Sequence, residues 1–356
     1  MYRDEQYSEI SNEILDVGHA ISRLRGTSEN LQDYVPAMRY LPKNDKSQLS
    51  KDLRTRRDHY LASLLRIAKE RFQQNVDLDC IYATVLQDKE EQLSKEEVST
   101  VCLSLVSGGF ETVPGTIISC IGSLSTADGQ YMQEEAVKDI MRYYPTMSEA
   151  WDQCLIEEKV PYVNAIVKEA LRYYTVLPLG QPRKTIRDIE WNGSIIPEGT
   201  TILFNTQAAN HGIVPSPFSL LIITTLANPY HIDVAHFGPT AHKFDPSRWL
   251  DSESIVPREV ESTGIQHFGF GGGSRMCPGY TLAQRMVYIM LVRMLTSYRI
   301  EASQENPPNT HFSEYNTTKT ALVAVPAPFK VKLHPRSENE LNDILEAVKA
   351  RIDTES

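Results

Sequence analysis

Apolar residues recur every three or four positions over long stretches of the first half of the chain, which predicts amphipathic helices. Residues 1–25 show this spacing, and residues 49–73 repeat it with arginines between the leucines. We expect these arginines on a solvated helix face. The same spacing predicts further helices over 131–143 and 157–174.

A capping box introduces the most apolar of the predicted helices. Ser94 stands at a cap position and Glu97 follows three residues later, the pattern in which the two residues cap each other. The helix is predicted to run from Val98 to about Leu124, and we expect it to be buried along its length in a large core. Pro114 lies inside it and is expected to kink it, because proline lacks the backbone N–H.

Short extended patterns replace the helical spacing after Pro178. Asn192-Gly193 separates runs of β-forming residues within 183–205, which predicts a hairpin. The elements predicted beyond the hairpin are a glycine-rich loop at 269–273, a helix from about 280 to 298, strands within 299–334 and an amphipathic helix over 337–353. Helices followed by a small β region indicate one mainly helical α+β domain.

Charge and cysteine content exclude some classes of protein. The 356 residues carry 36 Lys+Arg against 46 Asp+Glu, a net charge of −10, which argues against a nucleic-acid surface. The cysteines are too scattered for a disulfide scaffold, and none has C-x-x-C spacing: Cys80, Cys102, Cys120, Cys154 and Cys277. We expect free thiols in a reducing compartment.

Nothing in the pattern of apolar residues predicts a membrane span. The sequence from Met1 to Glu9 is too charged for a signal peptide or an anchor. No uninterrupted apolar run approaches the roughly 20 residues that a spanning helix needs. We therefore expect a soluble or peripheral chain.

A cysteine in a glycine-rich loop, within His267-Phe-Gly-Phe-Gly-Gly-Gly-Ser-Arg-Met-Cys-Pro-Gly-Tyr280, is the strongest chemical feature. Glycines let a large flat group approach the backbone, while backbone N–H groups and the following helix N-terminus favour a thiolate at Cys277. Arg275 could pair with an anionic substituent of that group. The alternatives are an inert core thiol and a phosphate-binding loop, although no clear strand precedes it.

The spacing of these residues resembles the haem-binding signature of the cytochrome P450 monooxygenases. The matching positions are Phe270, Gly273, Arg275, Cys277 and Gly279. The resemblance implies that Cys277 ligates the iron of haem b as an axial thiolate, which favours O–O cleavage. It also implies that Arg275 contacts a haem propionate, that Phe270 packs beside the thiolate, and that both glycines belong to the cofactor-binding loop.

A second match consists of Glu169-Ala-Leu-Arg172 and the later Pro246-Ser-Arg248-Trp249. An acid and a base three residues apart on a helix usually form a surface pair worth about 0.2–0.5 kcal/mol. In the family this pair is structural and is completed by a downstream arginine. The resemblance therefore implies that Glu169, Arg172 and Arg248 form a buried charge network that holds the haem-side loop without taking part in the chemistry.

A third match, Gly108-Gly-Phe-Glu111-Thr112, lies in the long apolar helix and is similar to the family's oxygen-activation motif. The resemblance implies room for dioxygen beside Gly108 and Gly109, with Glu111 and Thr112 as the catalytic residues that pass protons to it. The alternative is a buried helix in which Thr112 donates to a carbonyl of its own preceding turn.

The resemblance implies a mainly α, cytochrome P450-like fold with a small β region and a haem-thiolate monooxygenase. Short motifs at 111–115, 179–183 and 316–324 are similar to those of fungal hydroxylases of phenylacetate and small phenols. The implied partners are a small aromatic or secondary-metabolite substrate and NADPH–cytochrome P450 reductase. The alternatives are a non-catalytic truncated pseudoenzyme and a haem-thiolate isomerase or dehydratase that needs no reductase.

The chain departs from the family pattern at its beginning. The resemblance starts partway through the helical domain, so we expect the family's membrane anchor, N-terminal sheet and distal roof to be missing. A haem without that roof is more accessible to water, and we expect weak haem occupancy. The family implies the cytoplasmic face of the endoplasmic reticulum membrane, whereas a chain without the anchor would be cytoplasmic.

Residues 212–228 form an apparent insertion in the family pattern. The uncharged, β-branched and proline-free run from Phe218 to Ala227 is of the kind that aggregates when exposed. We interpret it as translated intron or another gene-model artefact, the alternative being a natural surface loop. The predicted organisation is therefore a partial P450-like domain over 1–335, interrupted at 212–228, and a helical tail over 336–356.

Overall fold

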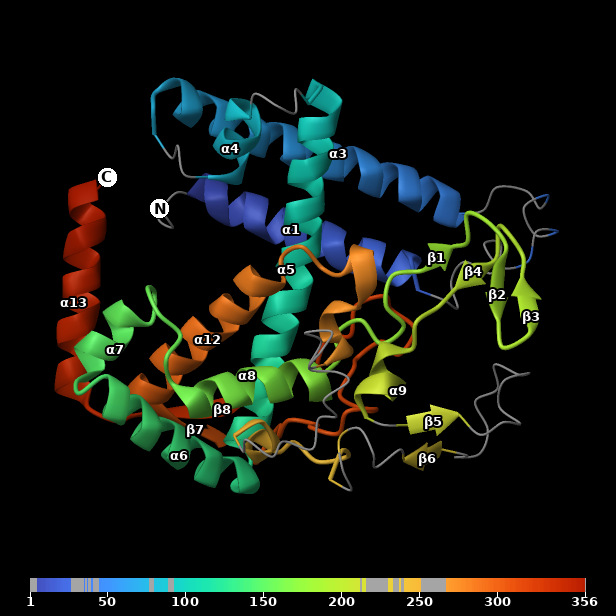
Figure 1. Ribbon diagram of the computed structural model, residues 1–356. Coiled ribbons are helices and arrows are strands. Elements are labelled where there is room, and N and C mark those ends of the chain that lie inside the picture. Colours follow the sequence, from blue (N-terminus) through green and yellow to red (C-terminus); the bar gives the residue numbers. More distant parts are fainter. Residues whose placement is uncertain are drawn as a thin grey trace. The chain divides into compact units, whose positions relative to one another are not determined.

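The computed structural model describes residues 5–26, 35, 37, 40, 45–76, 80–88, 93–211, 213–215, 230–232, 237, 240–250 and 267–355. It divides into two compact units, Met1–Thr112 and Val113–Ser356, and the division falls within helix α5 (Lys95–Ser125). The elements of each unit are labelled in Figure 1. They are mainly helices, as predicted for this fold class.

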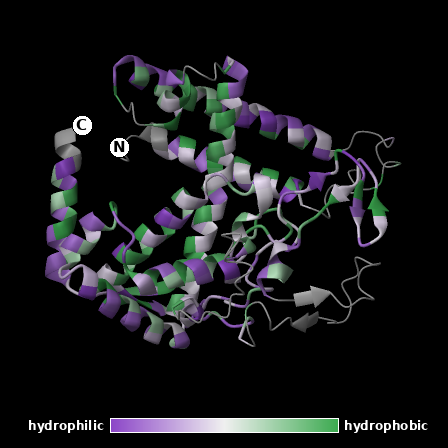
Figure 2. Ribbon diagram, viewed as in Figure 1, coloured by the Kyte–Doolittle hydropathy of each residue, from purple (hydrophilic) through white to green (hydrophobic). Residues whose placement is uncertain are grey.

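The first unit is built on two long helices, α1 (Glu5–Leu24) and α3 (Asp45–Gln73), which pack along each other. Their contact is sealed by buried apolar residues of both helices: Ile14, Val17, Leu53, Tyr60 and Leu61. α4 (Ile81–Gln87) follows. The helices predicted over 1–25 and 49–73 are confirmed, and α3 is mostly hydrophilic outside this contact, as the predicted solvated face requires (Figure 2).

The capping box at the start of α5 forms as predicted. The Ser94 N–H donates to a Glu97 carboxylate oxygen at 2.8 Å, and the Glu97 N–H donates to the Ser94 hydroxyl at 3.2 Å. The helix continues through Pro114 to its end. The expectation of burial along the whole length is wrong: Leu105 is 40% exposed, whereas Leu124 is fully buried. The first part of α5 contributes only partly buried residues to the core of its unit, so its other faces remain open.

α5 also bears on the expectation that no segment could span a membrane. Among the described helices it is the one long and apolar enough to do so by length and composition, with 22% of its most apolar window buried. Hydrophobic and neutral residues colour much of its length in Figure 2. The core helix of a globular protein passes the same test, and the second half of α5 does lie in the core of the second unit.

In the second unit, α8 (Pro161–Tyr173) and α12 (Tyr280–Ser297) pack together and against α6 (Ala127–Tyr143). α7 (Met147–Gln153) lies against α12, and α13 (Glu338–Glu355) lies against α7. The core that they enclose consists of buried apolar side chains such as Leu124, Ile140, Ile166, Leu291 and Leu295. The helices predicted for this part of the chain are thus confirmed in type and approximate range.

Strands β7 (Tyr298–Ala302) and β8 (Val331–Pro335) pair antiparallel, and β7 continues directly from α12. Gln133 of α6 ties β7 to the end of α5, because its fully buried amide bonds to the backbones of both. It accepts from the Ile300 N–H at 2.9 Å and donates to the carbonyls of Ile300 and Leu124. The strands expected within 299–334 are therefore confirmed.

The predicted hairpin is also present. β2 (Ile189–Trp191) pairs with β3 (Ser194–Ile196), and Trp191 lies opposite Ser194. Asn192 and Gly193 both have positive φ, 49° and 74°. Two such residues form the tight turn whose twist matches a hairpin.

Short elements fill the rest of the second unit. β1 (Arg183–Lys184) pairs with β4 (Thr201–Ile202), and β5 (Ile213–Pro215) pairs with β6 (Tyr230–Ile232). The other short elements are α9 (Thr206–Asn210) and the 3-10 segments η3 (Pro246–Trp249), η4 (Phe268–Phe270) and η5 (Gly273–Arg275). Of the predicted insertion at 212–228, only 213–215 are among the described residues.

Gly129, in the first turn of α6, provides a test of how closely α6 approaches the end of α5. A Cβ at this position would overlap the carbonyl oxygens of Ser123 and Leu124, so the backbone would have to move. We expect Gly129→Ala to lower the free energy of unfolding by about 2–3 kcal/mol, measured by urea denaturation. Asp128→Asn, an exposed change in the same turn, should cost less than about 0.5 kcal/mol. Equal losses would show that the close approach is not the cause.

Candidate functional site: a buried charge network and a thiol-bearing loop

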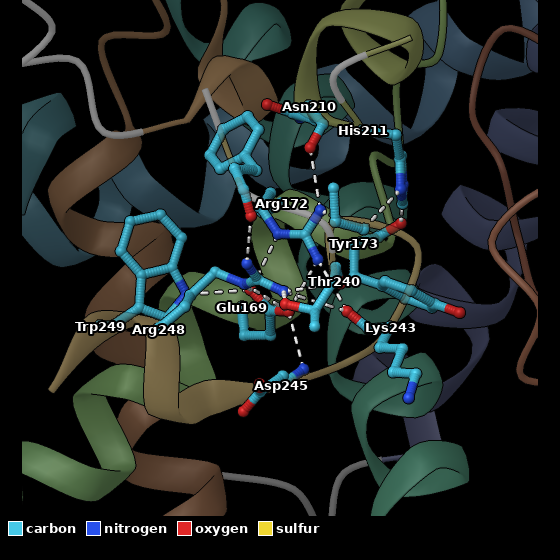
Figure 3. Close-up of polar contacts among 12 residues, drawn as sticks. Glu169, Arg172, Tyr173, Asn210, His211, Thr240, Lys243, Asp245, Arg248 and Trp249 are labelled. Atoms are coloured by element: carbon cyan, nitrogen blue, oxygen red, sulfur yellow. Dashed lines mark hydrogen bonds and ion pairs between the residues drawn. The ribbon is translucent and has the colours of Figure 1, made fainter. Parts of the chain in front are cut away.

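A fully buried carboxylate, that of Glu169 on α8, lies between two guanidinium groups (Figure 3). Arg172 donates to both of its oxygens, Nε at 2.8 Å and Nη2 at 2.7 Å, and Arg248 Nε lies 3.2 Å from each oxygen. The Asp245 N–H donates at 2.8 Å and the Trp249 indole N–H at 2.9 Å. The carboxylate therefore receives donors from both α8 and the segment around η3.

The two arginines carry the network to other segments through backbone carbonyls. Their remaining N–H groups donate to carbonyl oxygens, those of Asn210, Ala241 and Lys243 for Arg172 and those of Phe237, Thr240 and Lys243 for Arg248. Two cations against one carboxylate leave an excess positive charge, and these carbonyl dipoles offset it.

The ionised state of Glu169 follows from its partners. Burial alone would raise the pKa of its carboxyl, but the charges and hydrogen bonds of Arg172 and Arg248 and the Asp245 N–H lower that pKa below its ordinary value. The side chain is therefore a carboxylate at neutral pH. The three predicted members of the network, Glu169, Arg172 and Arg248, lie in contact, with 0%, 0% and 3% of their side chains exposed.

Asn210, the last residue of α9, connects this network to the glycine-rich loop. Its backbone carbonyl accepts from Arg172, while its side-chain oxygen accepts from the Phe268 N–H at 2.6 Å. Its amide group donates to the Thr175 hydroxyl at 2.8 Å. The residue is fully buried, so it joins α8, α9 and the start of the loop through bonds that are shielded from water.

The loop also lies directly against α8 at Gly269. A Cβ at that glycine would come within 2.8 Å of the Leu171 carbonyl oxygen, so only a residue without a side chain fits. Beside it, the buried His267 accepts from the Gly269 N–H through Nδ1 at 3.1 Å. Burial, with the nearby charges of Arg172 and Lys168, lowers the pKa of His267 to about 4. The imidazole is therefore neutral, as an accepting Nδ1 requires.

An aromatic row runs from the network into the loop. Trp249 lies 6.5 Å from His267, His267 lies 5.6 Å from Phe270, and Phe270 lies 6.2 Å from Tyr280 at the start of α12, measured between ring centroids. Phe270 also packs against the core of the second unit. The loop is thus held by apolar as well as polar contacts.

Cys277 stands at the end of this loop with its side chain exposed to solvent. Its N–H donates to the Phe270 carbonyl at 3.0 Å and closes the loop. The core-thiol alternative is therefore wrong for Cys277, although Cys120 and Cys154 are buried. All five cysteines are free, as expected. No N–H of the described loop 267–279 donates to the sulfur.

The loop fits a haem of the kind that the sequence implies. Gly271 and Gly273 have positive φ, 75° and 69°, and a Cβ at either would meet no atom within 4 Å, so the surface around them is open to a flat ligand. The exposed Arg275 makes no side-chain hydrogen bond or ion pair to another described residue, and its carbonyl accepts from the Arg183 guanidinium at 3.2 Å. Gly279 caps α12 beside Cys277. The accessible thiol of Cys277 suits a haem iron, and the exposed guanidinium of Arg275 suits the haem propionates.

The α5 motif belongs to the first unit. The Thr112 hydroxyl donates to the Gly108 carbonyl at 2.7 Å, which is the bond of the alternative interpretation and leaves the threonine oxygen able to accept. A Cβ at Gly108 or Gly109 would meet no atom within 4 Å. Glu111 is 8% exposed, and burial raises its pKa to about 7. A carboxyl that titrates near neutral pH can both give and take a proton.

Several residues of the network were not singled out from the sequence. Asn210 and Asp245 contact it only through the fold, and no spacing along the chain indicates this. Trp249 could have been inferred from the sequence, because it directly follows Arg248 and carries an N–H donor beside the predicted ion pair. Sequence patterns detect neighbours on one element, whereas these contacts join residues far apart in the chain.

Replacing Glu169 tests the network. Glu169→Gln leaves two buried guanidiniums without their anion, so we expect the free energy of unfolding to fall by about 3–5 kcal/mol at neutral pH. Glu134→Gln, which breaks the exposed pair with Arg336, should cost no more than about 0.5 kcal/mol. Because the folded-state pKa of Glu169 is lowered, its contribution is present above the unfolded pKa and disappears as the pH falls through the folded value. A loss that does not shrink at low pH would contradict this account.

Replacing Asn210 tests the link to the loop. Asn210→Ala leaves the Phe268 N–H without its buried acceptor, so we expect a loss of about 1–3 kcal/mol and faster amide hydrogen exchange within 267–279. Asn309→Ala removes an exposed amide that also bonds to backbone, and should leave exchange in that loop unchanged. Unchanged exchange in Asn210→Ala would show that the loop is held without this bond.

Comparison with known proteins agrees with these motifs. The family model described as Cytochrome P450 matches residues 1–213 and 221–333. A phenylacetate 2-hydroxylase of Emericella nidulans is 39% identical over 330 residues, which are 92% of this chain and 58% of the relative. A 3-hydroxyphenylacetate 6-hydroxylase of the same organism is 36% identical over 96% of the chain and 59% of the relative.

A cytochrome P450 monooxygenase of Mycosarcoma maydis is 31% identical over 94% of this chain and 57% of its own length. The chain thus spans about three fifths of the length of these curated relatives. The family's cofactor is a haem whose iron is ligated by a cysteine thiolate. By the match to the family model over most of its length, this chain belongs to the cytochrome P450 family.

Proposed function

We propose that the chain acts as a haem-thiolate monooxygenase on a small aromatic substrate, with Cys277 as the ligand of the haem iron. The observation that carries this proposal is the exposed thiol of Cys277 in a glycine turn directly before α12. Cys277 stands two residues before Gly279, the N-cap of α12. An exposed thiol with open space beside it suits a flat metal macrocycle.

The net reaction replaces a C–H bond of the substrate by C–O–H. One atom of dioxygen enters the substrate, and the other leaves as water after two electrons and two protons have been added. A haem held by Cys277 would supply the activation of dioxygen. The two electrons would come from NADPH through NADPH–cytochrome P450 reductase.

The chain's own residues would hold the cofactor and manage protons. Arg275 would bind a propionate, and Phe270, Gly273 and Gly279 would shape the surface under the ring. Glu111 would give a proton and Thr112 would pass it on through its hydroxyl, with the raised pKa of Glu111 placing this exchange near neutral pH. The network around Glu169 would act as scaffold, keeping the thiol-bearing loop in place.

The substrate class is inferred from the relatives. Two of them are named as hydroxylases of phenylacetate and 3-hydroxyphenylacetate. We infer a small aromatic acid of this kind, hydroxylated on its ring. By the same resemblance, the protein would act at the cytoplasmic face of the endoplasmic reticulum membrane.

The ferrous carbon monoxide difference spectrum tests the role of Cys277. We expect the haem bound by the 356-residue chain to show the thiolate spectrum. Cys277→Ser should abolish that spectrum, because a serine hydroxyl is not a thiolate ligand. Cys80→Ser, the same change at the thiol that caps α4, should keep the thiolate spectrum. A thiolate spectrum that survives in Cys277→Ser would exclude this ligand.

The same preparations separate a monooxygenase from a reductase-independent enzyme. We expect a hydroxylated product from phenylacetate only when NADPH and the reductase are both present. Product formed without NADPH would favour isomerase or dehydratase chemistry instead.

A further inference from the structure

Among the described residues, the titratable side chain that pairs with the buried carboxyl of Glu111 is His19 of α1. His19 Nε2 lies 3.5 Å from Glu111 Oε1, and both residues belong to the first unit. The preceding residue is Gly18, where an added Cβ would lie 3.8 Å from the Glu111 carboxyl carbon. α1 therefore approaches the carboxyl closely, and its histidine is the group that faces it.

The two groups differ in their access to water. The Glu111 side chain is 8% exposed and that of His19 is 46% exposed. Glu111 Oε1 is buried and accepts no hydrogen bond in the described structure. A buried oxygen without a hydrogen bond lowers the free energy of unfolding. A native structure that keeps such an oxygen therefore calls for a functional explanation. His19 contacts both the solvent and the Glu111 carboxyl, so it can carry a proton from one to the other.

We propose that His19 exchanges protons between solvent and the Glu111 carboxyl. In the forward step the Nε2–H bond of protonated His19 breaks and an O–H bond forms at Glu111 Oε1, leaving a neutral imidazole and a neutral carboxyl. The imidazole is then reprotonated by a hydronium ion or a buffer acid in the solvent, which leaves water or the buffer base. This role rests on the proposed function, in which each turnover consumes two protons. His19 is then the residue that returns a proton to Glu111.

Three of the arginines of α3 pair with carboxylates of α1 and α3. Arg56 pairs with Glu13 at 2.6 Å, Arg57 with Asp58 at 2.7 Å and Arg66 with Glu70 at 2.9 Å. Desolvation by burial is the cause of the raised pKa of Glu111. Within the described part of residues 1–112, no other charged side chain forms an ion pair with this carboxyl.

Infrared titration of the carboxyl group in the haem-free 356-residue chain tests the coupling directly. The difference between the wild type and Glu111→Gln isolates the Glu111 signal. We expect His19→Gln to raise the pKa of Glu111 and His19→Lys to lower it, each by about half a unit or more, because the partner's positive charge favours the carboxylate. His59→Gln, on the exposed face of α3, should leave it unchanged.

His19→Gln and His19→Lys both replace a half-exposed side chain. Circular dichroism reports whether each variant keeps the helix content of the wild type. A Glu111 pKa that is the same in the wild type, His19→Gln and His19→Lys would overturn the proposal. So would a shift of equal size in His59→Gln, since it would reflect net charge and not contact.

The haem-loaded chain with reductase supplies the second measurement. We expect His19→Gln to lower the product formed per NADPH several-fold, while the carbon monoxide spectrum is unchanged. If the thiolate spectrum is absent but the titration of Glu111 shifts as expected, the proposed function fails and the proton exchange stands. If the spectrum is normal and the titration does not shift, only the role of His19 fails.

Discussion

The Glu169 carboxylate between Arg172 and Arg248 is the interaction on which the second unit's candidate site depends. It joins α8 to the segment around η3, and the arginines extend it to carbonyls of three further stretches. A buried ion pair of this kind has a large desolvation cost, so it is weak evidence of net stability. What it provides is a fixed geometry, because every nitrogen of the two guanidinium groups has an acceptor within reach.

That fixed geometry matters because the thiol-bearing loop has few side chains that could fix its own conformation. Three consecutive glycines contribute no side chains, and two of the loop's glycines have positive φ. The loop is instead attached from outside, through Asn210 to the network, through Gly269 to the backbone of α8 and through Phe270 to the core. An open surface beside Cys277 is thereby combined with a firmly held backbone, which is what a cofactor ligand requires.

Two buried glutamates illustrate how surroundings decide protonation. Glu169 has its charge matched by two arginines, and its pKa is lowered. Glu111 is almost as well buried, but its ion-pair neighbour among the described residues is a histidine, and its pKa is raised to about 7. The first is a permanent anion and suits a scaffold, whereas the second changes protonation near neutral pH and suits proton transfer.

The sequence by itself determined most helices, the hairpin at Asn192-Gly193, the capping box at Ser94 and the motifs that identify the family. These features depend on residues that are close along the chain, so their spacing contains the necessary information. Only the tertiary structure decided that the first half of α5 is partly exposed, that Asn210 and His267 hold the loop, and that His19 faces Glu111. Each of these joins or separates elements distant in sequence, and packing between elements leaves no periodic pattern along the chain.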